Sequence, residues 1–181
     1  DESRSRLVTE TAYLYAPLAH RLGLYTINSE LLDLTLKYQK PEAYEYVVNR
    51  LKETETERAN FVAEFVRPVE KKLRNRGFEF SMKARTKSIS SIHNKMNKQG
   101  VSFDEVMDLF AIRIIIDSKP ENEKSDCWVA YSFVTEEYQT NPNRMRDWIT
   151  IPKSNGYESL HTTVLGAQGK WVEIQIRTKS M

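Results

Sequence analysis

The stretch Leu160–Thr178, LHTTVLGAQGKWVEIQIRT, predicts a β-hairpin. In its second half, apolar and polar residues alternate: Val172, Ile174 and Ile176 with Glu173, Gln175 and Arg177. A period of two places the two sets on opposite faces of a strand. The first half alternates in the same way, and the connection GAQGK is typical of a hairpin. We therefore expect one apolar and one polar face, with His161 on the same face as Glu173.

Further strand and helix patterns surround this hairpin. Strands are predicted at Phe78–Ala84, Phe110–Asp117 and Trp148–Ile151, which alternate or are rich in β-branched and aromatic residues. Helices are predicted at Ser88–Gln99 (ended by Gly100), at Ser102–Met107 and from about residue 125 to 138. Strands and helices thus follow one another from residue 78 onward, which predicts a mixed α/β sheet region.

The first 76 residues predict helices. One helical face carries an apolar stripe of Leu7, Leu14, Leu18 and Leu22. Gly23 stops this pattern, a second helix is expected from about Asn28 to Tyr38, and Pro41 opens a third. A four-residue spacing then relates Phe61, Phe65, Val69 and Leu73. It indicates one buried helical face that ends near Gly77. The expected fold class is therefore α+β, with a helical segment before a mixed sheet flanked by helices.

The composition excludes several classes of protein. The formal net charge is +2, so nothing global requires nucleic acid, and any anion site has to come from local clustering. Cys127 is the only cysteine, which excludes an internal disulfide and fits a reducing cytoplasm. No apolar run approaches the roughly 18 residues that span a bilayer, and no signal peptide is visible. Because the chain opens at Asp1 in helical sequence, we expect a piece of a longer cytoplasmic protein that has no membrane partner.

Two carboxylates suggest a metal site. Asp108 stands where a predicted helix gives way to a predicted strand, and Glu173 lies on the polar face of the hairpin. Carboxylate oxygens without a nearby thiolate suit Mg²⁺, which keeps several waters and takes further ligands from substrate phosphates. An aspartate at a strand start is also common as a cap or turn residue, and a polar strand face is also common as solvated surface. Both alternatives stay open.

A basic cluster occupies the stretch KARTKSISSIHNKM at positions 83–96. Its cations are Lys83, Arg85, Lys87 and Lys95. The residues Ser88–Ser91 offer hydroxyls and backbone N–H groups at a helix start, where the helix dipole favours anions. The cluster indicates a polyphosphate site or, alternatively, a basic surface patch for RNA.

The stretch PKSNGYESLHTTV at positions 152–164 combines a cation, an amide, an aromatic ring and an imidazole. Tyr157 can stack on a base, while Lys153 and Asn155 can reach ribose or phosphate oxygens. Upstream, Arg144 and Arg146 add cations for a second polyphosphate. These features indicate a site for two nucleotides with a metal between them, which means Mg²⁺-dependent phosphoryl or nucleotidyl transfer.

Six motifs in this order resemble the synthetase domain of the long RelA/SpoT homologues. They are ETAYLYAPLAHRLGL, KARTKSISSIHNKM, DLFAIRIII, DCWVAY, NRMRDWITIPKSNGYESLHTTV and VEIQIRT. The resemblance implies a nucleotidyltransferase-like, polymerase-β-type fold. It also implies the synthesis of (p)ppGpp, in which a pyrophosphoryl group moves from ATP to the 3′-hydroxyl of GDP or GTP.

The resemblance assigns roles by position. It implies catalytic and Mg²⁺-binding roles for Asp108 and Glu173, the latter either assisting the metal or deprotonating the 3′-hydroxyl. ATP would be bound by Arg85, Lys87, Lys95 and Arg113, with the two arginines beside the adenine. GDP or GTP would be bound by Arg144, Arg146, Lys153, Asn155, Tyr157, His161, Gln175 and Arg177.

The chain departs from the family pattern at a few positions. Ala84 replaces a usual Gly and Ser90 a usual Tyr, so a catalytically weak, regulatory guanine-nucleotide-binding module of the same family stays an alternative. The motif Arg144–Asp147, RMRD, resembles the basic switch form of bifunctional members. No His is followed by Asp, so the chain lacks the HD hydrolase signature and no hydrolase activity is expected.

The resemblance also implies a domain arrangement. Residues 1–50 would be a helical connector that follows a hydrolase domain, and residues 51–181 would be the synthetase domain, shortened at its C-terminus. A longer parent protein would contact the ribosome through domains outside this chain.

Overall fold

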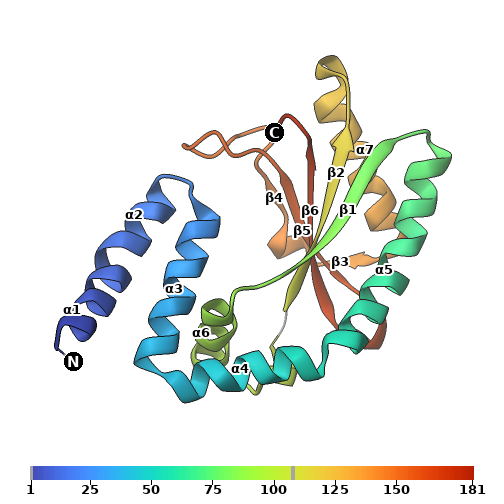
Figure 1. Cartoon of the computed structure of the whole chain (residues 1–181). Coiled ribbons are helices and arrows are strands. Elements are labelled where there is room, and N and C mark those ends of the chain that lie inside the picture. Colours follow the sequence, from blue (N-terminus) through green and yellow to red (C-terminus); the bar gives the residue numbers. More distant parts are fainter. Residues whose placement is uncertain (1, 107–108) are drawn as a thin grey trace. The chain divides into compact units, whose positions relative to one another are not determined.

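The computed structural model describes residues 2–106 and 109–181, which form two compact units. Unit 1 comprises Asp1–Thr56 and Lys87–Val106, and unit 2 comprises Glu57–Thr86 and Met107–Met181. The chain therefore leaves unit 2 after the first strand, returns to unit 1 for residues 87–106, and re-enters unit 2 (Figure 1). Each unit is described by itself.

Unit 1 is helical. Its elements are α1 (Glu2–Glu10), the π-helix η1 (Thr11–Tyr15), α2 (Ala16–Arg21), α3 (Tyr25–Gln39), α4 (Pro41–Glu53), α6 (Ile89–Gln99) and the 3₁₀-helix η2 (Phe103–Glu105). Pro41 occupies the first turn of α4, and Gly100 ends α6 in the left-handed conformation, both as predicted. The helix α6 packs against α3 and α4, with Ile92 fully buried.

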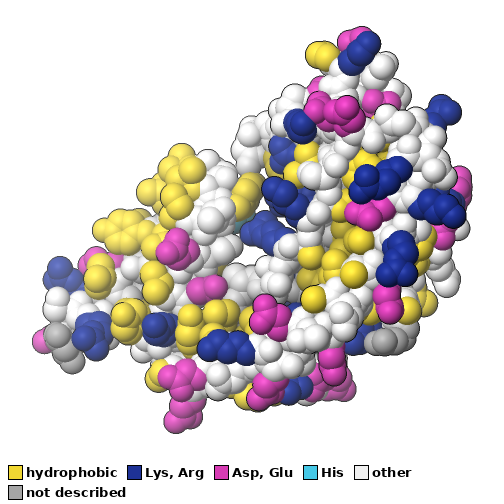
Figure 2. All heavy atoms as spheres, turned by 45° about the vertical axis from the view of Figure 1, so that its right-hand side comes forward, with side chains coloured by type: hydrophobic (Ala, Val, Ile, Leu, Met, Phe, Trp, Pro, Cys, Tyr) yellow, Lys and Arg dark blue, Asp and Glu magenta, His cyan; other side chains and the backbone are white. Residues whose placement is uncertain are grey.

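The apolar stripe of the N-terminal helices lies on the surface of unit 1. Its members Leu7, Leu14, Leu18 and Leu22 are 58%, 57%, 50% and 65% exposed. Figure 2 shows hydrophobic side chains gathered on this part of the molecule. The π-helical turn η1 interrupts the α-helical period between Leu7 and Leu18, which the sequence pattern did not predict.

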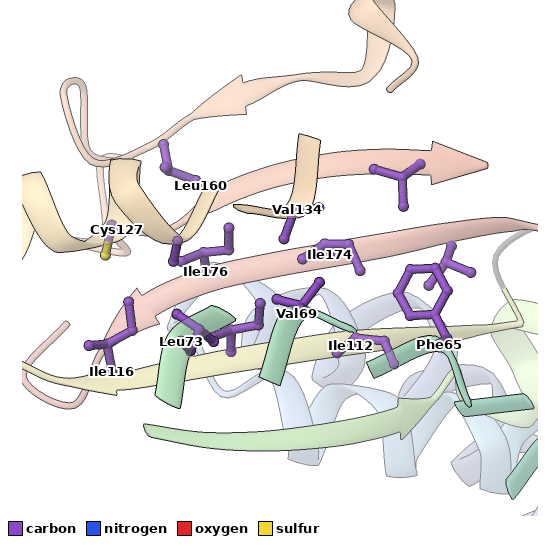
Figure 3. Close-up of a cluster of buried hydrophobic side chains, with 14 of the residues drawn as sticks. Phe65, Val69, Leu73, Ile112, Ile116, Cys127, Val134, Leu160, Ile174 and Ile176 are labelled. Carbon is purple, nitrogen blue, oxygen red and sulfur yellow. The ribbon is translucent and has the colours of Figure 1, made fainter. Parts of the chain in front are cut away.

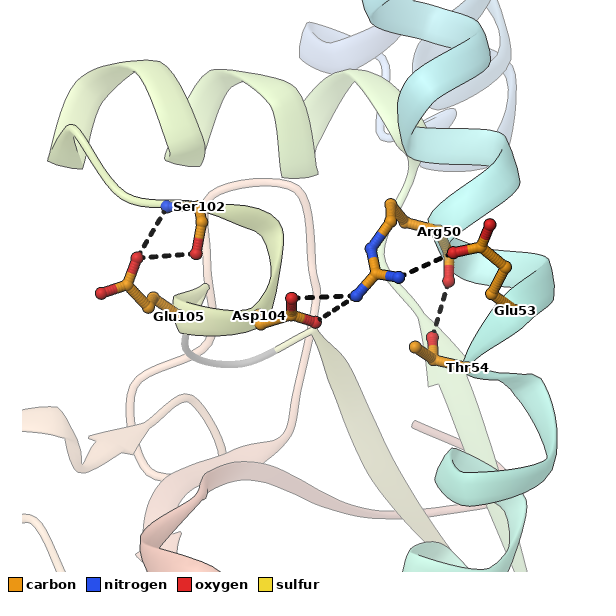
Figure 4. Close-up of polar contacts among 6 residues, drawn as sticks. All are labelled: Arg50, Glu53, Thr54, Ser102, Asp104 and Glu105. Atoms are coloured by element: carbon orange, nitrogen blue, oxygen red, sulfur yellow. Dashed lines mark hydrogen bonds and ion pairs between the residues drawn. The ribbon is translucent and has the colours of Figure 1, made fainter.

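The end of unit 1 is anchored to α4 (Figure 4). Arg50 on α4 donates two hydrogen bonds to the carboxylate of Asp104, at 2.7 and 2.9 Å, and a third to Glu53 at 2.6 Å. Its guanidinium also lies over the ring of the buried Phe103, 5.6 Å from the centroid. These contacts fix the η2 turn on α4.

Unit 2 contains a six-stranded mixed sheet. Its strands are β1 (Glu79–Thr86), β2 (Phe110–Asp117), β3 (Gln139–Thr140), β4 (Arg146–Asp147), β5 (Leu160–Leu165) and β6 (Trp171–Thr178). The order is β1-β2-β6-β5-β3, and β4 also pairs with β5. The pair β2–β6 is parallel and the other pairs are antiparallel. The hairpin β5–β6 and the α+β fold class are confirmed.

The core of unit 2 lies between one face of the sheet and the helices α5 (Glu55–Asn75) and α7 (Glu123–Glu137) (Figure 3). The predicted face of α5 is confirmed, since its members Phe61, Phe65, Val69 and Leu73 are all buried. They pack with the inward residues of the central strands, such as Ile112 and Ile174. Cys127 on α7 is fully buried in the same cluster, and this burial raises the pKa of its thiol to about 12.

Trp148–Ile151 is not a strand, so this prediction is wrong. The strand here is the two-residue β4, after which the carboxylate of Asp147 accepts the backbone N–H groups of Ile149 and Thr150, at 3.0 and 2.8 Å. An aspartate side chain that accepts the backbone N–H groups two and three residues ahead closes a turn. These N–H groups are then not used for hydrogen bonds between strands. The aromatic and β-branched residues suggested a strand, but of these four only Ile149 is buried, beneath this turn.

Among the residues that the structure describes, no helix combines the length and the apolar character needed to cross a membrane.

Candidate active site

A row of polar side chains crosses the sheet on the face opposite to α5 and α7. Residues that pair across neighbouring strands place their side chains on the same face. The pairing therefore aligns one residue each from β1, β2, β6, β5 and β4: Lys83, Arg113, Gln175, His161 and Arg146. Inward residues alternate with them and are buried in the core.

A second row lies on the same face, displaced by two residues along each strand from the first row. It aligns Arg85, Ala111, Glu173 and Thr163. In this row Ala111 lies between Arg85 and Glu173. The predicted placement of His161 and Glu173 on one polar face is confirmed by this register.

A pocket of about 270 Å³ opens at one end of these rows. Its lining residues are Arg144, Arg146, His161, Thr162, Thr163 and Glu173. Arg144 from the β3–β4 connection and Arg146 from β4 thus line the pocket together with a carboxylate and an imidazole from the hairpin. A pocket with cations on one wall and a carboxylate on another suits a phosphorylated ligand whose hydroxyl meets the carboxylate.

Hydrogen bonds link the side chains of the rows. Arg113 donates to the amide oxygen of Gln175 from Nε and Nη2, at 3.3 and 3.2 Å. The Gln175 amide nitrogen donates in turn to Oε1 of Glu173 at 2.8 Å, and His161 Nδ1 lies 3.6 Å from the same oxygen. Gln175 is thereby held by its oxygen and its nitrogen at once. The network fixes the orientation of the Glu173 carboxylate and the plane of the Arg113 guanidinium.

The segment before β5 forms a tight turn at Lys153–Gly156. The backbone N–H of Gly156 donates to the carbonyl of Lys153 at 2.8 Å, and Gly156 has a φ of 76°. Glycine adopts this conformation at no steric cost, so the turn requires it. The Asn155 side chain accepts the backbone N–H of Tyr157 at 3.2 Å, which orients the tyrosine as it leaves the turn.

Tyr157 lies between cations and the polar row. Its hydroxyl is 2.9 Å from Nε2 of His161. The Lys153 ammonium lies 5.1 Å from its ring centroid and the Arg177 guanidinium 5.8 Å. Lys153 also lies 5.0 Å from the centroid of Trp148. An aromatic ring that already attracts cations offers a π-face to which a flat base can bind.

The residues that could hold a metal fit Mg²⁺. Glu173 presents a carboxylate to the pocket, and no thiolate lines it. Within residues 2–106 and 109–181, no group of three or more His, Cys, Asp and Glu side chains could hold a metal ion. Mg²⁺ does not need such a group, because it uses one or two protein carboxylates together with water and phosphate oxygens. The second predicted ligand, Asp108, lies outside the described residues.

The predicted ATP-binding residues divide between the two units. Arg85 and Arg113 belong to unit 2 and lie in the two rows of its sheet, whereas Lys87 and Lys95 belong to unit 1. Unit 2 therefore contains these two arginines, the residues predicted to bind the guanine nucleotide, and Glu173. The two lysines lie in unit 1, one just before α6 and one on it.

The start of α6 was predicted to bind an anion, but two of its backbone amides bind a carboxylate of the protein itself. The Ser90 backbone N–H donates to Oδ1 of Asp33 at 2.7 Å and that of Ile89 to Oδ2 at 3.3 Å. The N-cap residue Ser88 accepts the N–H of Ser91 with its hydroxyl, also at 3.3 Å. The Asp33 carboxylate on α3 thus already accepts hydrogen bonds from amides that the sequence had suggested for a phosphate. Ser90 itself, where the family usually has Tyr, is only 4% exposed.

Several site residues escaped the sequence patterns. Asp33 lies outside every motif, and only the packing of α3 on α6 brings it to the start of that helix. Thr163 lines the pocket opposite Glu173, and the alternation of β5 had placed it on the correct face without suggesting a role. Trp148 was expected in a strand, so its contact with Lys153 was not foreseen.

Comparison with known proteins identifies relatives. The family described as "Region found in RelA / SpoT proteins" matches residues 84–181, more than half of the chain. A guanosine-3′,5′-bis(diphosphate) 3′-pyrophosphohydrolase of Aquifex aeolicus is 39% identical over 182 residues, covering 100% of this chain and 25% of that protein. A GTP pyrophosphokinase of Photobacterium angustum is 38% identical over 181 residues, covering 100% of this chain and 24% of that protein. The chain thus spans about a quarter of the length of these relatives.

A solved structure shares the fold. The crystal structure of the small alarmone synthetase 2 from Bacillus subtilis matches with a TM-score of 0.51 and 26% sequence identity. The match covers 74% of this chain and 72% of that chain.

Proposed function

The chain belongs to the RelA/SpoT family, and from this premise we propose that it synthesises (p)ppGpp. A pyrophosphoryl group would move from ATP to the 3′-hydroxyl of GDP or GTP. The relatives include a protein named GTP pyrophosphokinase and a structure named as an alarmone synthetase, which supports this proposal. Because the chain spans only about a quarter of its longer relatives, the activity of the whole protein also remains a proposal.

One observation carries the proposal most directly. Glu173 lies on the polar face of the sheet, at a pocket whose other lining residues include Arg144 and Arg146. A phosphorylated acceptor can bind the arginines through its phosphates while its hydroxyl reaches the carboxylate. This is the arrangement that phosphoryl transfer to a sugar hydroxyl needs, since the reaction depends on positioning and on charge stabilisation.

In this mechanism Glu173 orients and deprotonates the acceptor. The 3′-oxygen attacks the β-phosphorus of ATP, the bond from that phosphorus to the oxygen bridging it to the α-phosphorus breaks, and AMP leaves. The hydroxyl proton passes to the Glu173 carboxylate. Gln175 and His161 hold that carboxylate in place, because both contact its Oε1. A fixed base keeps the reactants close to the attack geometry.

Glu173 and Asp108 are also the residues that would hold Mg²⁺. When bound, the ion would neutralise charge on the transferred phosphates. The protein supplies the remaining charge through its own cations on the same face, Arg85 and Lys83 in β1 and the two arginines of the pocket.

The guanine nucleotide would bind around the turn before β5. Tyr157 offers its ring to the base, with Lys153 and Arg177 beside the ring to meet phosphate or carbonyl oxygens. Asn155 holds Tyr157 through the backbone and so positions this platform. His161 binds the Tyr157 hydroxyl and lies beside Glu173, so it connects the base platform with the reacting end.

The residues proposed for ATP are two arginines of the sheet and two lysines at α6. Arg113 is bonded to Gln175 along one edge, which fixes its guanidinium plane, and such a plane stacks on an adenine ring. Arg85 lies on the neighbouring strand and would serve the same base. Lys87 and Lys95 would bind the phosphates. These assignments follow the family resemblance, and the strand register supports the two arginines.

Synthesis can be tested directly. Incubation of the chain with ATP, GDP and Mg²⁺ should yield a guanosine tetraphosphate and AMP, resolved by anion-exchange chromatography. Asp108→Asn and Glu173→Gln should each reduce the rate by at least about a hundredfold, because each removes a charge expected at the metal. Glu121→Gln, at an exposed position outside the site, serves as the matched control and should keep the rate.

Two results would contradict the proposal. Near-normal synthesis by Glu173→Gln would show that the base and the metal ligand are assigned wrongly. Guanine-nucleotide binding by calorimetry without any product would instead support a regulatory binding module of the same family.

A further inference from the structure

Asp33 closes the N-terminal end of α6 with a carboxylate from another helix. Its two oxygens accept the backbone N–H groups of Ser90 and Ile89, at 2.7 and 3.3 Å. Hydrogen bonds to an ionised carboxylate are shorter and stronger than neutral ones. A negative charge at this end also complements the helix dipole. The cap is therefore a charged tie between α3 and α6, within unit 1.

The tie acts on a helix that is packed on one side and open on the other. Ile92 is fully buried and Ser90 is 4% exposed, so the face of α6 that bears these residues lies against α3 and α4. Asp33 fixes the end of α6 where this packed helix begins. Without the tie, the first turn would depend on the Ser88 hydroxyl, which accepts the Ser91 N–H at a longer 3.3 Å.

The two lysines expected at ATP belong to this segment, Lys87 at the N-terminal end of α6 and Lys95 in its second half. Lys87 comes directly before the N-cap residue Ser88, and Lys95 lies on the helix. Because the first amides are already bonded to Asp33, an incoming polyphosphate cannot use them unless α3 releases them. Binding therefore has to come from side chains, and their position depends on how firmly the first turn is held.

We propose that Asp33 is a positioning residue for ATP, holding α6 so that Lys87 and Lys95 meet the phosphates. This inference rests on the proposed function, which assigns these lysines to ATP. The proposal gives α3 a role in nucleotide binding, although no sequence motif includes Asp33. In this role Asp33 does not contact the substrate. Its loss should therefore weaken ATP binding and leave the rate of the chemical step unchanged.

The test compares two substitutions of Asp33 with a matched control on the same helix. Asp33→Ala removes both acceptors, and Asp33→Asn keeps one oxygen that can still accept an amide N–H. The exposed Glu30 is the control, since Glu30→Ala removes a carboxylate from α3 at a position without a bond to α6 in the described chain. All variants are assayed in the full 181-residue chain.

We expect Asp33→Ala to raise KM for ATP about tenfold, the loss expected for a charge-assisted tie. KM for GDP and kcat should stay within about twofold of the wild type, and Asp33→Asn should recover part of the loss. Glu30→Ala should match the wild type. An unchanged KM for ATP in Asp33→Ala would overturn the proposal, as would equal losses for both substrates together with a lower melting temperature.

A second measurement does not depend on synthesis. Hydrogen exchange should show faster exchange of the Ile89 and Ser90 amides in Asp33→Ala than in Glu30→Ala, while calorimetry should show weaker ATP binding. If the wild type makes no product but binds ATP in an Asp33-dependent way, the proposed function fails and the role of Asp33 stands. If the amides exchange no faster and ATP binds as before, the role of Asp33 fails independently of synthesis.

Discussion

Thr162 carries a buried hydroxyl with no hydrogen-bond partner among the described residues of the chain. The residue is 1% exposed and lies on the inward face of β5, among apolar side chains. Burying a polar group costs desolvation free energy, and without a hydrogen bond this cost is not compensated. Thr162→Val keeps the shape of the side chain and removes the hydroxyl, so the free energy of unfolding should rise by about 1 kcal/mol. Urea titration followed by circular dichroism measures it.

Thr178 provides the control for this substitution. It is equally buried, on the neighbouring strand, but its hydroxyl donates to Glu123 at 3.1 Å. Thr178→Val should therefore destabilise the protein. If both substitutions lower stability, Thr162 has a hydrogen-bond partner after all.

Tyr157 allows a test of base stacking. Base–aromatic stacking is worth roughly 1–3 kcal/mol, so Tyr157→Ala should weaken guanine-nucleotide binding about ten- to a hundredfold. Tyr157→Phe keeps the ring and loses only the contact with His161, so its effect should be small. ATP affinity should barely move. Calorimetric titration of GDP and ATP into both variants measures these effects.

A structural role for Tyr157 would give a different pattern. A ring needed for packing would lower the melting temperature when removed and would harm both nucleotides alike. Equal losses for GDP and ATP in Tyr157→Ala would therefore exclude stacking as its main role.

At the scale of elements, the turn after β4 depends on a single carboxylate. Burial, the largest influence, would raise the pKa of Asp147, but hydrogen bonds from the side chain and backbone of Thr150 and from the backbone of Ile149 hold it below its usual range. A folded pKa below the unfolded value of about 3.9 means that this stabilisation is complete above that pH. It is lost as the pH falls through the folded pKa.

Asp147→Asn should therefore remove a pH-dependent contribution. At pH 7 the variant should be less stable than the wild type, and the difference should shrink as the pH falls below about 4. Urea unfolding of both proteins at several pH values gives this difference directly. A difference that stays constant with pH would mean that the charge of Asp147 does not hold the turn.

Elements with a long regular pattern were predictable. The four-residue spacing on α5 and the alternation of β5 and β6 follow from burial on one side, so they specified both the element and its inward face. Trp148–Ile151 misled because a run of four aromatic and β-branched residues cannot distinguish a strand from a turn that buries one side chain. The strands β3 and β4 have two residues each, too short to leave a pattern.

At the scale of the molecule, the sequence predicted which residues share a face but not which elements share a unit. The register that aligns Arg113, Gln175 and His161 follows from three strand patterns once their order is known. The return of Lys87–Val106 to the N-terminal helices left no local signal, because it depends on packing between segments far apart in the chain. The bond from Asp33 to α6 was hidden for the same reason.

The position of β6 bears on when the sheet can be completed during synthesis of the chain. This last strand of the sequence lies in the middle of the sheet, between β2 and β5. The five strands β1 to β5 precede β6 in the sequence and so leave the ribosome first. They form two separate groups, β1 with β2, and β3 and β4 with β5, until β6 enters between β2 and β5. Glu173 and Gln175 arrive with the same strand. A nascent chain therefore gains the continuous sheet and the Glu173 carboxylate in one step, so a copy translated only as far as β5 would have neither.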